Sequence, residues 1–124
     1  MPSQTPAKAV VLFAHGSRDP LWRKPLEAVA ARIAREAPDV AVRCAYLELT
    51  EPDLPAVAAE LSAAGIEAIT VVPMFLGAGK HARDDLPLLV ERLRSEHPRI
   101  AFSLQPPVGE DARLLDLLAR IALE

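Results

Sequence analysis

Short β-branched apolar runs alternate with amphipathic helical patterns four times along this chain. The apolar runs span residues 9–14, 40–47, 66–72 and 100–104, and the helical patterns span residues 22–33, 54–61, 86–93 and 114–121. This alternation predicts an α/β fold, in which right-handed crossovers place helices on both faces of a four-stranded parallel sheet. A chain of 124 residues can bury one core but not two, so we expect a single flavodoxin-like domain over residues 1–124.

Residues typical of helix ends support these boundaries. Thr50 and Asp53 have the spacing of a capping box before the second helix, with Asp in place of Glu. Gly65 stands where that helix should end, and Pro38 and Pro98 should stop the first and third helices. We therefore expect the elements to follow one another without a linker.

Composition excludes several classes of partner. A formal net charge of -3 leaves no basic surplus for nucleic acid, and an aromatic content of 4% argues against a base-stacking surface. The amino-terminal stretch MPSQTPAK holds no apolar run of signal-peptide length, and no stretch reaches the roughly 20 apolar residues of a membrane span. The lone Cys44 fits a reducing compartment and is expected to be a small core residue. We therefore expect a cytoplasmic protein with no nucleic-acid or membrane partner.

Two histidines and one glutamate follow three different strands. In a sheet of order 2-1-3-4, ligands bind beyond the carboxyl ends of the strands, at the reversal of order between the first and third strands. His15 follows the first strand, His81 the third, and Glu48 the second. Strands about 4.8 Å apart could bring both imidazoles to one divalent ion, with Glu48 close by. The alternative is that His15 hydrogen-bonds a turn, His81 stands at a helix start and Glu48 is a solvated acid.

The segment FLGAGKHARDD, residues 75–85, resembles a phosphate-binding loop only in part. A P-loop needs a glycine five positions before its Gly-Lys pair and a Ser or Thr after it. Those positions hold Met74 and His81. The segment is therefore better explained by its histidine than by a nucleotide phosphate.

Basic residues gather close to the two histidines although the whole chain is acidic. Arg18, Lys80 and Arg83 lie within a few positions of His15 or His81. Such a group suits a substrate that bears carboxylates. The alternative is ordinary surface charge, including pairing of Arg83 with a neighbouring aspartate. Trp22 is expected in the core or an interface, and His97 at a helix carboxyl end.

Four segments together resemble a known family. VVLFAHGSRDP, AYLELTEPDL, VVPMFLGAGKHARDDLP and PPVGEDARLLDLLARI are similar, in this order and over nearly the whole chain, to segments of the short-form sirohydrochlorin chelatases. These enzymes belong to the class II chelatase superfamily and serve cobalamin and sirohaem biosynthesis. The motif AHGSR alone is weak, but its combination with PMFLGAGKHARDDLP at this separation is specific.

The resemblance implies a lyase that inserts divalent cobalt, iron or nickel into a tetrapyrrole with many carboxylates. It implies that His15, of the HGSR motif, and His81, of the GxH loop, bind the metal, and that Glu48, of the LEL motif, assists with metal or protons. The metal ion is then a substrate, and no organic cofactor is expected. Family members of double length carry two such domains that face each other across a cleft, so we expect this chain to form a homodimer.

Two other functions remain open on the residues alone. The same ligands and basic residues would serve a non-catalytic protein that delivers a metal ion or a tetrapyrrole. A flavodoxin-like nucleotide or phosphoryl-transfer module is disfavoured by the incomplete P-loop and by the absence of an obvious aspartate after the first strand.

Overall fold

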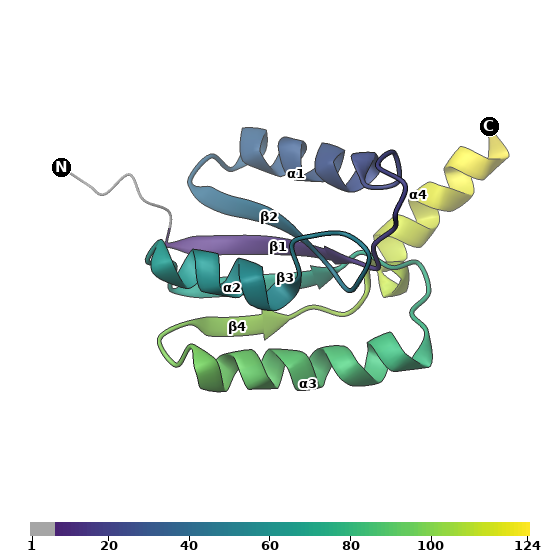
Figure 1. Ribbon diagram of the computed structural model, residues 1–124. Helices are drawn as coiled ribbons and strands as arrows, with labels where there is room; N and C mark the ends of the chain where they lie inside the picture. The colour runs from purple at the N-terminus through teal and green to yellow at the C-terminus, as the bar shows by residue number, and fades with distance from the viewer. Residues whose placement is uncertain (1–6) are drawn as a thin grey trace.

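The computed structural model describes residues 7–124 and contains a four-stranded parallel sheet in the order β2-β1-β3-β4 (Figure 1). The strands are β1 (Lys8–Ala14), β2 (Val40–Tyr46), β3 (Ala68–Pro73) and β4 (Ala101–Leu104). The helices are α1 (Lys24–Glu36), α2 (Leu54–Ala63), α3 (Lys80–Glu96), the short 3-10 helix η1 (Val108–Glu110) and α4 (Ala112–Leu123). The α/β class, strand order and parallel pairing are confirmed. Residues 1–6, which belong to the amino-terminal stretch MPSQTPAK, lie outside the described residues.

Two hydrophobic clusters lie on opposite faces of the sheet. On one face, α2 and α3 pack against alternate strand residues that include Val11, Phe13 and Ile69. On the other face, α1 packs through Leu26 onto a cluster that includes Tyr46. Successive side chains of a strand point to opposite faces, so the apolar residues of the strands pack against two helical layers, as expected for a parallel sheet with helices on both faces.

The last helix departs from this layered arrangement. None of the residues of α4 is buried, and in Figure 1 it projects away from the carboxyl end of the sheet. Its apolar side chains Leu115, Leu118 and Ile121 are exposed. Despite this apolar face, no helix within residues 7–124 is long and apolar enough to cross a membrane.

Prolines and one glycine end the helices as predicted. Helices α1 and α3 end two residues before Pro38 and Pro98. Gly65 follows α2 with a φ of +86°, in the left-handed region that favours glycine at a helix carboxyl end. The proposed capping box is wrong, because Asp53 itself caps α2 by accepting a hydrogen bond of 2.9 Å from the backbone N–H of Ala56. Thr50 instead forms hydrogen bonds with the backbone of Ser17, in the loop after β1.

Several boundaries differ from the predicted ones for local reasons. Strand β3 begins at Ala68 rather than at residue 66, because the Ile66 N–H donates to the Leu61 carbonyl at the end of α2. Helix α1 begins at Lys24, so Trp22 lies in the turn that precedes it. Helix α3 begins at Lys80, before its apolar period becomes visible in the sequence. The loop from β3 to α3 is correspondingly short and places His81 in the first helical turn.

Candidate functional site at the carboxyl edge of the sheet

The loops that follow β1 and β2 run side by side and bring His15 next to Glu48. Beyond the strand ends, the Leu47 N–H donates to the Ala14 carbonyl at 2.9 Å, and the Glu48 N–H donates to the His15 carbonyl at 3.0 Å. The Nε2 atom of His15 lies 3.0 Å from Oε1 of Glu48, within hydrogen-bonding distance. Both side chains are about half exposed, at 56% and 55%. The pair is therefore preformed and open to a ligand.

Gly16 permits this close approach of the two loops. Its φ of +105° lies in the region that favours glycine. A Cβ atom at this position would stand 1.7 Å from the Glu48 carbonyl oxygen. Any side chain at position 16 would thus push the Glu48 loop away from His15.

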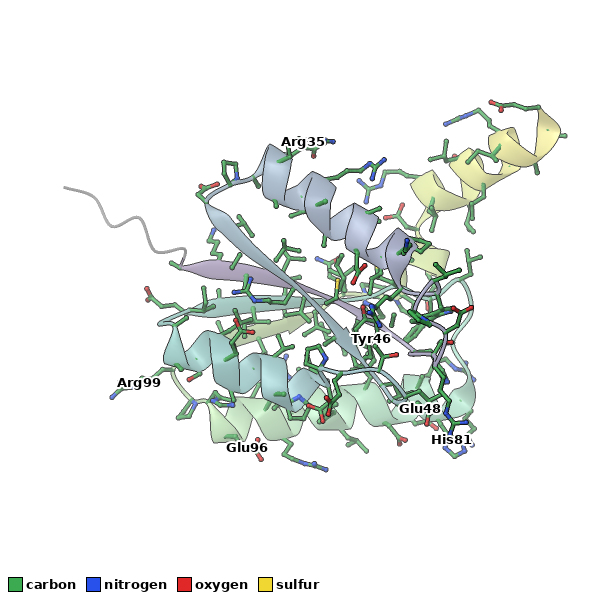
Figure 2. All side chains as sticks on the ribbon, turned by 45° about the horizontal axis from the view of Figure 1, so that its top comes forward. Arg35, Tyr46, Glu48, His81, Glu96 and Arg99 are labelled. Atoms are coloured by element: carbon green, nitrogen blue, oxygen red, sulfur yellow. The ribbon has the colours of Figure 1, made fainter. Side chains whose placement is uncertain are left out.

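His81 reaches the same edge from a third loop but stands apart from the pair. It is the second residue of α3, with an exposed side chain. Figure 2 shows His81 and Glu48 at the same end of the molecule. Among residues 7–124, no group of three or more His, Cys, Asp or Glu side chains stands close enough together to hold a metal ion. The structure thus joins His15 to Glu48, and a site that also includes His81 stays a prediction.

The predicted basic residues are all exposed. Arg18 follows β1, and Lys80 and Arg83 lie in the first turn of α3. Within the described part of the chain, none of the three forms an ion pair, so the alternative pairing of Arg83 with a neighbouring aspartate is not observed. Arg83 also lines a largely apolar cavity of about 370 Å³ whose wall includes Phe75 and Leu104. These cations are available to an anionic ligand.

Tyr46 anchors the end of β2, two residues before Glu48. Its side chain is buried in the α1 cluster, and the Trp22 ring lies 6.2 Å from it between centroids. Burial, with the nearby Cys44 and Glu27, raises the pKa of Tyr46 to about 12. Burial also raises the pKa of the half-buried Cys44 thiol. Both groups stay neutral near pH 7, so neither supplies a base or a thiolate. Trp22 is 40% exposed despite its contact with Tyr46, so it is not a core residue.

Two residues that shape the pair, Gly16 and Thr50, are hard to recognise from spacing. The glycine directly after His15 is a signal for a tight turn, but its contact with the Glu48 loop depends on strand pairing. Thr50 has the spacing of a helix cap and instead bonds to Ser17, 33 residues away. The spacing of apolar residues along the chain carries no information on a contact between residues so far apart in sequence.

The fold and this edge define a class: an α/β protein with flavodoxin-like strand order and a His–Glu pair at the reversal of strand order. The sequence model of the CbiX family matches residues 9–124. The chain therefore belongs to the CbiX family, and the resemblance seen in its motifs is confirmed.

Individual relatives agree with this assignment. The chain is 27% identical over 123 residues to the sirohydrochlorin cobaltochelatase of Methanococcoides burtonii, covering 93% of this chain and 94% of that protein. It is 35% identical to a CbiX protein of cobalamin biosynthesis from Marinobacter aquaeolei, with a TM-score of 0.81 and coverage of 93% of both chains. It is 26% identical to the cobalt complex of the Bacillus subtilis sirohydrochlorin chelatase SirB, with a TM-score of 0.76, covering 91% of this chain and 48% of that one.

Proposed function

We propose that this protein is a sirohydrochlorin chelatase, a lyase that inserts a divalent metal ion into the tetrapyrrole. Cobalt is the first candidate metal, and iron and nickel are the others. The observation that carries the proposal is the His15–Glu48 pair, 3.0 Å apart and half exposed at the ligand-binding edge of the sheet, in a chain of the CbiX family.

Metal insertion makes three demands that these residues can meet. The protein must hold the ion weakly, leave a coordination face open to the ring nitrogens, and accept two pyrrole protons. We propose that His15 and His81 hold the ion through neutral imidazoles. The Glu48 carboxylate either accepts pyrrole protons or is a third ligand, and its contact with Nε2 orients the His15 ring. A closed site with four ligands would retain the ion instead.

The basic residues Arg18, Lys80 and Arg83 are proposed to bind the carboxylates of the tetrapyrrole. We expect each alanine variant to weaken tetrapyrrole binding about 2- to 5-fold, because exposed charge pairs contribute at most about 1 kcal/mol. The loss should be larger at low salt, where screening is weaker, and cobalt binding should be unchanged. Fluorescence titration of sirohydrochlorin measures this, with Arg99→Ala, at the opposite end of the molecule in Figure 2, as the control. Unchanged binding in all three variants would contradict the assignment.

We also propose that the active form is a homodimer. The face of the sheet that carries α1 is uncovered over β4, because Ala101 and Ser103 are exposed there, and no residue of α4 is buried. A second copy supplies both missing surfaces at once: each α4 can cover the other chain's open sheet. The relative SirB, of which this chain covers 48%, has the length for two such units in one chain.

If α4 forms the proposed dimer interface, a charge on its apolar face should prevent dimer formation. Ile121→Glu, on the exposed apolar face, should convert the dimer to monomers, because a charge would be buried without a partner. Light scattering measures the mass. Asp116→Arg, on the polar side of the same helix, should leave the dimer intact. Monomeric wild-type protein that keeps full specific activity on dilution would refute the proposal.

Residues 1–124 are proposed to form one chelatase-like domain that acts in the cytoplasm, with no organic cofactor. The function itself is tested by incubating purified protein with sirohydrochlorin and cobalt, iron or nickel in turn, and by recording the absorbance change on metallation. Turnover above the uncatalysed rate with at least one metal supports a chelatase. Stoichiometric binding without turnover would instead identify a delivery protein for a metal or tetrapyrrole.

A further inference from the structure

Thr50 connects the loop that carries Glu48 to the loop that carries His15. Its hydroxyl group accepts a hydrogen bond of 3.0 Å from the Ser17 N–H and donates one of 2.7 Å to the Ser17 carbonyl. One side chain thus satisfies both backbone groups of a residue 33 positions away. Both residues are half-buried, so water reaches these bonds only in part.

The connection lies where the strand pairing has ended. The two backbone hydrogen bonds of Leu47 and Glu48 extend the β1–β2 ladder by one step beyond each strand. The Thr50–Ser17 hydrogen bonds then join the two loops a second time, farther from the strands. Between Glu48 and Thr50, Leu49 has a φ of +65°. A leucine adopts this left-handed conformation at an energetic cost, so surrounding contacts must maintain it. The Thr50 N–H donates to the Glu48 carbonyl at 2.7 Å across this turn.

The His15–Glu48 contact needs such support because packing does not provide it. Both side chains are about half exposed, and an exposed pair of this kind is worth little by itself. The relative position of the two groups is therefore set by the backbone of their loops. Gly16 removes the steric obstacle between the loops, and the Thr50 hydroxyl is the side-chain contact that ties them together.

We propose that Thr50 is a positioning residue for metal insertion, which keeps Glu48 within hydrogen-bonding distance of His15 by holding the two loops together through Ser17. This inference rests on the proposed chelatase function for its effect on turnover. Its effect on the loops is independent of that function.

The test compares Thr50→Val, which keeps the shape but loses the hydroxyl, with Thr50→Ser, which keeps the hydroxyl. For Thr50→Val we expect kcat to fall about 10- to 100-fold, the range for residues that orient a ligand, with little change in KM for sirohydrochlorin. Thr50→Ser should recover activity to within a few-fold of wild type. Ser62→Ala, which removes the hydroxyl of an exposed serine near the carboxyl end of α2, is the control and should retain full activity.

Amide hydrogen exchange provides a second readout that does not depend on activity. In Thr50→Val, the amides of Ser17 and Glu48 should exchange faster, while those in the middle of β1 should not. Thr50→Ala serves the same purpose if the valine variant folds poorly. Wild-type kcat in Thr50→Val, or unchanged exchange at both amides, would overturn the inference. If wild-type protein shows no metallation, the proposed function fails, and the exchange rates alone decide whether Thr50 holds the loops.

Discussion

Replacing His15 by alanine is expected to abolish metal insertion while the protein stays folded. The His15 imidazole is one of the two proposed to hold the divalent ion, so kcat should fall by more than the 10- to 100-fold typical of residues that only orient a ligand. The side chain is 56% exposed, and its removal should change the free energy of unfolding by no more than about 0.5 kcal/mol. Metallation kinetics and urea denaturation measure the two effects.

His97→Ala is the matched control for this variant. His97 caps the carboxyl end of α3, and its ring lies 6.4 Å from that of Phe102 between centroids. It is thus 16 residues along α3 from His81, at the end of the helix remote from the site. Full activity is expected in His97→Ala. Wild-type turnover in His15→Ala would contradict the assignment of His15 to the metal-insertion site.

Replacing His81 by alanine is expected to weaken cobalt binding strongly. If both histidines hold one ion, the variant retains one imidazole and at most one carboxylate. Affinity should then fall by at least about 10- to 100-fold, in line with the loss from disturbing even an outer partner of a metal site. Folding should survive, because His81 is exposed in the first turn of α3 and Gly79 still begins the helix. Calorimetric titration with cobalt measures the affinity, and equal affinity in wild type and His81→Ala would refute a two-histidine site.

Glu48→Gln separates the two roles open to Glu48. The amide keeps the shape of the side chain and its ability to contact Nε2 of His15, but it cannot accept a proton as a carboxylate does. If Glu48 mainly accepts pyrrole protons, cobalt affinity should persist while turnover falls. If it is a ligand, both should fall. We favour the first result, because two histidines and water can hold the ion but the two protons need an acceptor.

Local patterns in the sequence determined most of the architecture. The change from a period of two to a period near 3.6 marks each strand and helix, because one face of a strand and one stripe of a helix must be buried. The positions of Gly65, Pro38 and Pro98 marked helix ends, since the backbone angles of glycine and proline depend only on local sterics. Right-handed crossovers fix the face on which each helix lies but allow more than one strand order, so the flavodoxin-like order does not follow from them alone. The polar start of α3 was missed, because an apolar period is absent there.

Only the tertiary structure decided which of the candidate site residues meet. The register of β1 against β2 pairs Ala14 with Tyr46, and this places the following residues, His15 and Glu48, in loops that touch. The same register brings Thr50, an apparent helix cap, next to Ser17. The tertiary structure also leaves every residue of α4 unburied. A propensity or a cap acts within a few residues. These contacts instead depend on how distant segments are placed in space, which a local pattern does not encode.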